Sequence, residues 1–332
     1  MSEDGNAAGS SNGSPADAQP GPANSDPRTV QRGIVYGLAA YGIWGLVPLF
    51  WNLVKSASAL EILAMRMAWS LVFAIGLSLI VLPRGWFRRV ATRRNLFMLA
   101  AAAILVSINW GVYIWATTNG HVTETALGYY INPIFSILVG VLVLHERLRR
   151  YQWLAVGIAA AAVVVLTIEY GQLPWIALTL AVSFGTYGLL KNLVHKGAVE
   201  TLVIESGFMF VPAVAYLIFL QVTGDLTFGH QGWVHGALLA AGGLVTLVPL
   251  LLFAAAATRI PLSMIGLLQY ITPTTQFLLG VLYFGEQMPA GRWVGFGLVW
   301  IALMILTIGT LVTLRQRRRR SPELVGSAEQ LG

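Results

Sequence analysis

The chain has 332 residues, of which 56% are hydrophobic and only 11% are charged, and its mean hydropathy is +0.70. A soluble globular domain carries roughly a quarter charged residues, so this composition excludes an ordinary soluble protein and indicates a lipid bilayer. The net charge of +7 does not indicate nucleic-acid binding, because nearly all Lys and Arg residues lie in predicted loops and tails, where they meet lipid headgroups.

The chain begins with a polar segment and continues with ten apolar runs. Residues 1–31 lack any apolar stretch and any signal-peptide pattern, so they are predicted to form a disordered cytoplasmic tail. Runs of about 20 apolar residues are long enough to cross a bilayer as helices, and no strand-like alternation is present. Residues 316–332 are predicted to form a basic, polar cytoplasmic tail. The spans are placed at 33–53, 58–82, 96–117, 123–144, 151–169, 174–194, 199–222, 235–257, 262–284 and 292–314.

The distribution of positive charge predicts the orientation. With the amino terminus in the cytoplasm, 18 of the 21 Lys and Arg residues fall in cytoplasmic loops and tails. Lys55 and Arg292 fall on the opposite side, and only Arg66 lies within a span. Cytoplasmic loops of membrane proteins are enriched in Lys and Arg, so both termini are expected in the cytoplasm.

An internal repeat relates the two halves of the chain at an offset of 140 residues. Residues 130–146 and 270–286 are identical at eight of seventeen positions. The halves, 32–170 and 171–315, each contain five predicted spans, and because five is odd the second copy enters the membrane from the opposite side. We therefore predict an all-α polytopic membrane protein with ten transmembrane helices as two inverted five-helix repeats. This build is typical of secondary transporters that alternate access to a midplane site.

Arg66 and Glu205 are charged residues at corresponding positions of the two halves, inside predicted spans. A charge at the centre of a membrane helix costs at least about 2.5 kcal/mol. We expect the two residues to form an ion pair across the repeat interface, either as a gating or proton-coupling element or as a static pair that fixes helix packing. Lys191 lies near a span end, where its amine either reaches the cytoplasmic surface or binds a carboxylate of the substrate.

Pro133 and Pro273 occupy equivalent positions and are expected to act as hinges, because each removes a backbone hydrogen bond and bends its helix. Polar and aromatic residues gather around both prolines and recur in other spans. They either line a substrate cavity or bond helices to one another, and the recurrence at both prolines favours the cavity. The predicted substrate-binding residues are Trp44, Asn109, Trp110, Tyr113, Tyr129, Tyr130, Asn132, Tyr187, Gln269, Tyr270 and Thr272.

The sequence carries no signature of an enzyme. It has no Gly-rich lysine loop, no HExxH and no GxSxG within a span. It has no cysteine, which excludes disulfides and thiolate catalysis, and its five histidines lie at or beyond span ends without ligand spacing. We therefore expect no catalytic residue, no metal site and no cofactor.

Several short motifs are shared with one known family. They are Glu61-Ile62-Leu63 with Arg66, Leu127 to Pro133, Gln152 to Val156, Gln269-Tyr270-Ile271, and Val248-Pro249-Leu250-Leu251. Over residues 30–315 this pattern resembles the RarD proteins, bacterial members of the EamA branch of the drug/metabolite transporter superfamily. The resemblance implies a ten-helix plasma-membrane permease with a central cavity, and chloramphenicol sensitivity or resistance is the usual label of that family.

The sequence thus favours a secondary transporter in the bacterial plasma membrane. We expect it to export a small polar or amphipathic metabolite, or a drug such as chloramphenicol, by alternating access. Its expected partners are the small-molecule substrate and the lipid bilayer, with proton coupling through Glu205 and no nucleic acid. Two alternatives stay open, a passive small-solute channel and a membrane scaffold that transports nothing.

Overall fold

Helices make up all the regular secondary structure in the computed structural model, which describes residues 27–144, 149–194 and 196–329. A long apolar run forms a helix in lipid because the helix satisfies its own backbone N–H and C=O groups. Two of the apolar helices are α5 (Val122–Leu144) and α7 (Trp175–Val194). Eight further segments are long and apolar enough to cross a membrane, namely α1 (Pro27–Leu53), α2 (Ala59–Val81), α4 (Arg93–Thr118), α6 (Arg150–Tyr170), α8 (Ala198–Thr223), α9 (Gly232–Ala257), the interrupted segment Met264–Tyr283 and α12 (Ala290–Glu329).

The predicted spans agree with the helix ends to within three residues, apart from a few differences. Helix α1 begins at Pro27, because proline is favoured in the first turn of a helix, so residues 27–31 are helical and not part of a disordered tail. The rest of that predicted tail, residues 1–26, lies outside the described residues. A short helix, α3 (Trp86–Val90), occupies the loop between α2 and α4, and α12 continues to Glu329 through the predicted basic tail.

The span predicted at 262–284 is not one continuous helix. It consists of α10 (Leu262–Leu268), α11 (Ile271–Leu278) and the π-helical turn η3 (Leu279–Tyr283). Pro273 has no N–H to donate to the carbonyl of Gln269, and its ring crowds that carbonyl, which explains the break between α10 and α11. Pro133, at the equivalent position, lies inside α5 without interrupting it. The two prolines therefore have different effects on their helices.

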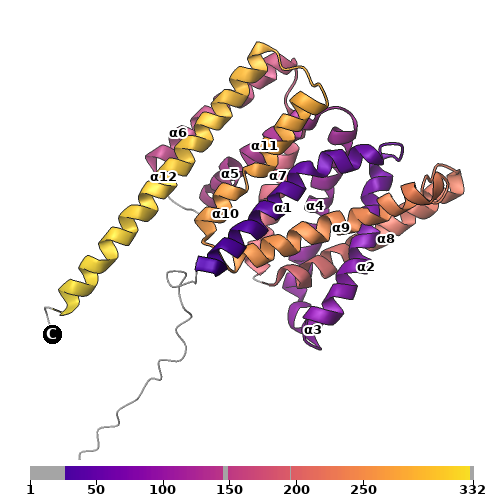
Figure 1. The fold of residues 1–332 in the computed structure, drawn as a ribbon, viewed down its shortest axis with the longest axis horizontal. Coiled ribbons are helices and arrows are strands. Elements are labelled where there is room, and N and C mark those ends of the chain that lie inside the picture. Colours follow the sequence, from indigo (N-terminus) through magenta and orange to yellow (C-terminus); the bar gives the residue numbers. More distant parts are fainter. Residues whose placement is uncertain (1–26, 145–148, 195, 330–332) are drawn as a thin grey trace, which may run out of the picture.

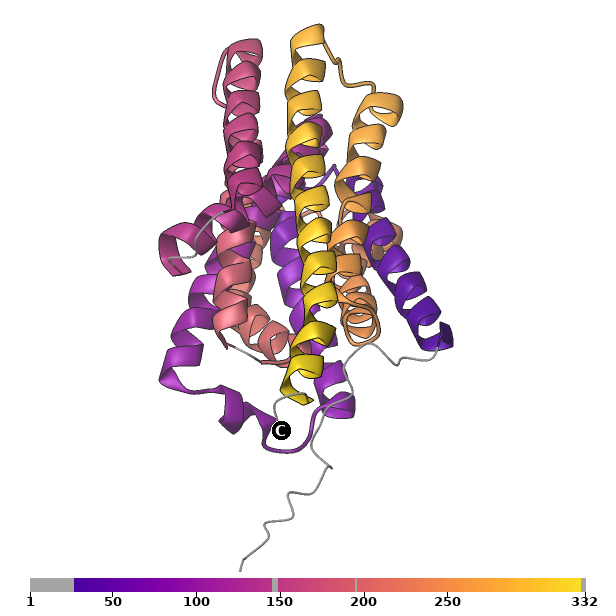
Figure 2. The ribbon, with the colours of Figure 1, turned by 90° about the vertical axis from the view of Figure 1, so that its left-hand side faces the viewer.

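The two halves of the chain pack against each other in reciprocal pairs. Helix α1 packs on α9 and α11, and its counterpart in the second half, α7, packs on α4 and α5. Likewise α2 contacts α9, and its counterpart α8 contacts α4. Helices α2, α5 and α6 each pack on their own counterparts, α8, α11 and α12. Figure 1 shows α6 and α12 side by side at one edge of the bundle, and Figure 2 shows how far α12 extends along it.

Helices α2 and α9 approach each other closely at a glycine. A Cβ atom at Gly243 would lie 2.7 Å from the carbonyl carbon of Trp69 and 2.8 Å from the nitrogen of Ser70. A larger residue therefore does not fit at Gly243 without moving backbone, as is usual where small residues let membrane helices touch. Three residues further along α9, this contact brings Thr246 within reach of Arg66 on α2.

Glu61 shows that α2 and α8 run antiparallel. It lies in the first turn of α2, and its carboxylate accepts hydrogen bonds of 2.9 Å from both the N–H and the hydroxyl of Thr227. It also accepts a 3.0 Å bond from the N–H of Phe228. Thr227 follows the end of α8, so the start of one helix lies beside the end of the other.

Glu286 binds the start of α5 in a similar way. Its carboxylate accepts hydrogen bonds from the N–H of Val122, from the N–H of Thr123 at 2.9 Å and from the hydroxyl of Thr123 at 2.5 Å. The first N–H groups of a helix have no partner within the helix and carry partial positive charge, so a carboxylate stabilises them.

The Glu286→Gln variant is expected to lose about 2 kcal/mol of unfolding free energy, because it removes charge-assisted bonds and turns an amide NH₂ toward donors. Thermal unfolding of the purified protein measures this loss. Asp225→Asn, which changes an exposed aspartate after α8, serves as the control and should unfold like the wild type. An unchanged Glu286→Gln protein would show that these bonds contribute no net stability.

Candidate functional site

Arg66 lies seven residues after the start of α2 and is almost completely buried, with 6% of its surface exposed. Its Nε–H donates a 2.6 Å hydrogen bond to the hydroxyl of Thr246 on α9. The guanidinium carbon lies 3.7 Å from the centre of the Trp110 ring on α4 and 5.5 Å from that of Trp51 on α1. Among the described residues, no carboxylate lies within 4.0 Å of this cation.

Glu205 on α8 pairs with Lys191 on α7. The Lys191 Nζ atom lies 2.8 Å from the Glu205 carboxylate, and it also donates to the hydroxyl of Thr201. The hydroxyl of Tyr187 donates a 3.1 Å bond to the same carboxylate. Lys191 therefore binds a carboxylate of the protein itself, a role that neither sequence-based alternative included. The pair is internal, since only 4% of the Glu205 side chain is exposed.

The ion pair predicted between Arg66 and Glu205 is therefore wrong. Each residue lies seven positions after the first residue of its helix, but α2 and α8 run antiparallel. With a rise of 1.5 Å per residue, the two side chains lie roughly 20 Å apart along the bundle. Equivalent positions of the two halves thus fall in opposite halves of the bundle, and the charges cannot meet.

Gln276 joins three helices around the centre of the bundle. Its Nε2 group donates to the carbonyl of Trp44 on α1 at 3.3 Å and to the hydroxyl of Tyr113 on α4 at 3.0 Å. The side chain is 1% exposed, and its Oε1 atom has no hydrogen-bond partner among the described residues. A buried acceptor without a donor is costly, so a bound ligand or water would satisfy it. Tyr113 belongs to the same buried cluster as Trp51, which lies beside Arg66.

Asn109 links α4, α5 and α7. Its Nδ2 group donates 3.1 Å hydrogen bonds to the carbonyl of Leu180 and to the hydroxyl of Ser183 on α7. Its Oδ1 atom accepts a 3.3 Å bond from the hydroxyl of Tyr129 on α5. Asn109 is completely buried, so these bonds satisfy it without solvent and hold the tyrosine in one position.

A ladder of aromatic rings leads from Tyr113 to the Lys191–Glu205 pair. The ring centres of Tyr113 and Tyr129 lie 5.8 Å apart, those of Tyr129 and Phe184 lie 6.0 Å apart, and those of Phe184 and Tyr187 lie 5.9 Å apart. Tyr187 ends the ladder at Glu205. Such contacts are favourable edge-to-face or tilted arrangements. The ladder is thus a continuous path of aromatic and polar side chains through the bundle.

Asn132 lies beside this ladder. Its Oδ1 atom is buried without a hydrogen-bond partner among the described residues. A Cβ atom at Gly185 would lie 3.2 Å from that oxygen, so Oδ1 faces α7 next to Phe184. The predicted residues Trp44, Asn109, Trp110, Tyr113, Tyr129, Asn132 and Tyr187 therefore lie on or beside one internal path.

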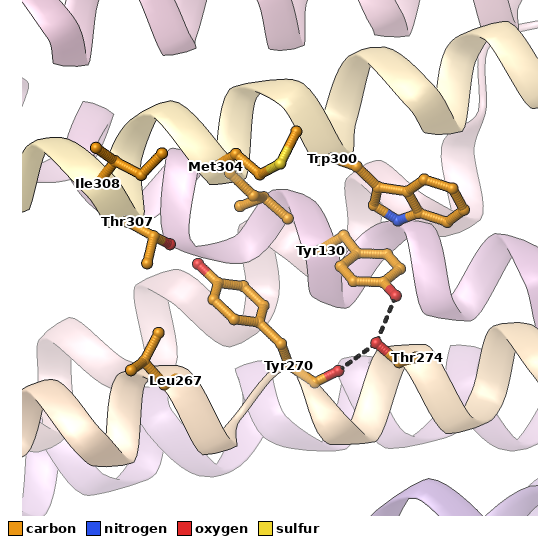
Figure 3. A pocket seen from close by; sticks show the side chains of 9 residues that line it. Tyr130, Leu267, Tyr270, Thr274, Trp300, Met304, Thr307 and Ile308 are labelled. Atoms are coloured by element: carbon orange, nitrogen blue, oxygen red, sulfur yellow. Dashed lines mark hydrogen bonds between the residues drawn. The ribbon is translucent and has the colours of Figure 1, made fainter.

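Tyr130 and Tyr270 lie elsewhere, in a groove between α5, α10, α11 and α12 (Figure 3). The hydroxyl of Thr274 donates to the carbonyl of Tyr270 at 2.7 Å, and the hydroxyl of Tyr130 bonds to that of Thr274 at 2.8 Å. The groove has a volume of about 400 Å³ and exposed apolar side chains at its rim, so it opens toward lipid. Its lining also includes Leu267, Trp300, Leu303, Met304, Thr307 and Ile308.

Among the described residues, those predicted around the two prolines do not all lie together. Thr272 donates a 2.8 Å hydrogen bond to the carbonyl of Tyr41 and so joins α11 to α1. Gln269 lies in the break between α10 and α11 and is half-buried. Gln276 of α11 faces the interior of the bundle, and the sequence-based prediction did not include it. The sequence feature that could have identified this residue is a glutamine inside an apolar span, three residues after the proline.

Long apolar helices around an internal path of charged, polar and aromatic side chains define a multi-pass membrane protein of the solute-transporter class. The chain belongs to the EamA-like transporter family, whose sequence profile matches residues 31–168 and 174–308. It is therefore a transporter and not an enzyme.

Named relatives agree with this assignment, and one solved structure shares the fold. The chain is 54% identical to protein RarD of Streptomyces exfoliatus, over 90% of this chain and 94% of that protein. It is 40% identical to protein RarD of Escherichia coli K12, over 88% of this chain and 99% of that protein. A solved crystal structure covers 84% of this chain and 98% of its own with a TM-score of 0.54, and at 17% identity the likeness concerns the fold alone.

Proposed function

We propose that the chain is a secondary transporter that exports a small polar or amphipathic metabolite, or a drug such as chloramphenicol, by alternating access. The observation that carries this proposal is the internal path from Arg66 and Gln276 through the aromatic ladder to Lys191 and Glu205. Polar side chains are costly inside a membrane protein, and those that face its interior commonly mark a substrate pathway. Aromatic faces and unpaired acceptors suit an amphipathic solute.

Ten transmembrane helices arranged as two inverted repeats, 32–170 and 171–315, form the second part of the proposal. The reciprocal helix packing and the antiparallel arrangement of α2 and α8 support it. In such a fold the two halves rock against each other around a central site. The positive charge of the loops supports cytoplasmic termini and a place in the bacterial plasma membrane.

The conformational change is proposed to use the hinge at Pro273, where the helix is already broken, together with Pro133 inside α5. Arg66 and the Lys191–Glu205 pair are the proposed gating and coupling groups. When the carboxylate of Glu205 binds a proton, its attraction to Lys191 is lost, so α7 and α8 are free to separate. This arrangement would couple transport to protons.

Solute counterflow in liposomes tests the proposal. Liposomes loaded with unlabelled chloramphenicol, or with one member of a panel of metabolites, are diluted into labelled compound. A transporter gives a saturable, transient accumulation of label, and Tyr129→Phe should reduce it because Asn109 loses its bond to this ring. Tyr216→Phe, on a partly exposed ring outside the path, is the matched control. Flux that never saturates would favour the channel, and no flux of any compound would favour the scaffold.

A further inference from the structure

The guanidinium of Arg66 has more donors than the protein uses. An arginine side chain has five N–H groups, and within the described part of the chain only the one at Nε donates a hydrogen bond to the protein, which Thr246 accepts. The ring of Trp110 covers one face of the guanidinium at 3.7 Å. The two Nη groups form the planar fork that matches the two oxygens of a carboxylate.

The described acidic side chains that are buried or half-buried in the bundle already bind other partners. Glu61 binds the residues that follow α8, Glu286 binds the start of α5, and Glu205 binds Lys191. Glu124 lies against His121, 2.9 Å away. In the part of the chain that the structure describes, none of them is within 4.0 Å of Arg66. A buried charge without a counterion is unfavourable, so the missing negative charge is expected to come from outside the protein.

Neighbouring groups complete a binding site for an anion. The hydroxyl of Tyr113 accepts a bond from Gln276, so its own proton is left to donate to a ligand. Tyr113 belongs to the same buried cluster as Trp51, whose ring lies 5.5 Å from the guanidinium carbon of Arg66. The Oε1 atom of Gln276, the residue that bonds Tyr113, is fully buried without a partner among the described residues, so it can accept a hydrogen bond from a ligand. The rings of Trp110 and Trp51 offer apolar faces beside the cation. A carboxylate on an apolar or planar body meets all of these groups.

We propose that Arg66 binds the carboxylate of the transported substrate, so that the substrate class is an organic anion with an apolar body. This inference rests on the proposed transport function and narrows it. Arg66 is enclosed in the structure, so the substrate reaches it when the helices around the path separate. The Thr246 hydroxyl and the Trp110 ring hold the guanidinium in place for that event.

Equilibrium binding of a matched pair of probes tests this inference. Phenylacetate and phenylacetamide differ in charge but have nearly the same shape, and both are measured on the purified full chain in detergent at constant chloride. The wild type is expected to bind phenylacetate at least tenfold more tightly than the amide. The Arg66→Gln variant should lose this difference, and Arg66→Lys should keep part of it, because an ammonium lacks the fork.

The controls separate binding from folding. Arg292→Gln removes another arginine that lies on an aromatic ring, 4.1 Å from the centre of Tyr170, and should leave phenylacetate binding unchanged. Thr246→Val keeps the guanidinium but removes the hydroxyl that holds it, so a smaller loss of phenylacetate binding is expected. This variant tests the proposal even if Arg66→Gln does not fold. Three outcomes would each overturn the proposal: the wild type binds both probes equally, it does not bind phenylacetate, or Arg66→Gln binds phenylacetate as tightly as the wild type.

Counterflow distinguishes failure of the anion proposal from failure of the proposed transport function. Neutral chloramphenicol is the comparison solute. If chloramphenicol shows saturable counterflow in the wild type and phenylacetate shows none, the protein transports solutes but Arg66 does not select anions. If phenylacetate shows counterflow in the wild type and not in Arg66→Gln, both proposals are supported.

Discussion

Replacing Lys191 with methionine is expected to lower the free energy of unfolding by about 3 kcal/mol, because removal of one partner leaves a buried charge without a counterion. Glu205 is 4% exposed, and among the described residues it keeps only the hydroxyl of Tyr187 as a hydrogen-bond donor after this change. Methionine retains the apolar stem of lysine, so the loss reports the charge and not the packing. Equilibrium unfolding of the purified protein measures it.

A double variant provides the internal comparison. Lys191→Met combined with Glu205→Gln is expected to recover most of the lost stability, because the neutral amide still accepts a bond from Tyr187 and leaves no unpaired charge. Lys55→Met changes an exposed lysine and should have almost no effect. If the double variant is as unstable as Lys191→Met alone, the ion pair is not the source of the effect.

Replacing Gln276 with leucine is expected to reduce saturable counterflow by about tenfold, which corresponds to ~1.4 kcal/mol, within the range for leaving a buried polar group unpaired. Gln276 holds the hydroxyl of Tyr113 and offers the Oε1 atom to the ligand. Leucine has a similar volume, so the helix packing around the carbonyl of Trp44 should persist. The transport rate is measured with equal amounts of folded protein in the liposomes.

The matched comparison for this variant is Gln269→Leu. Gln269 lies in the break between α10 and α11, outside the bonds that join α1, α4 and α11. The Gln269→Leu substitution should therefore reduce transport less than Gln276→Leu does. The opposite order would move the ligand from the Gln276 region to the break and contradict the path described above.

The helical parts of this protein were predictable from the sequence because lipid imposes a simple rule. Each long apolar run must form a helix that satisfies its own backbone, so α2 and α9 were placed to within three residues. Repeated residues such as Pro133 and Pro273 revealed the duplication without any structure. The break at Gln269 was predicted only as a bend, because the effect of a proline depends on what packs around it.

The sequence predicted which kinds of residue form the candidate site, but not which of them contact one another. Most of the predicted residues do lie along the internal path, since polar and aromatic groups inside apolar helices turn toward the protein interior. The sequence placed Arg66 and Glu205 at equivalent positions but carried no information about their depth. In the structure, Lys191 is the partner of Glu205, and Tyr130 and Tyr270 line a separate groove.

Composition, hydropathy and the repeat alone determined that this is a multi-helix membrane protein, because they depend on properties that each segment has by itself. Only the tertiary structure decided which side chains meet, because contacts depend on the direction and close approach of helices far apart in the chain. The antiparallel arrangement of α2 and α8 separates Arg66 from Glu205, and the glycine contact at Gly243 brings Thr246 to Arg66. As a result, one buried cation is left without a carboxylate among the described residues.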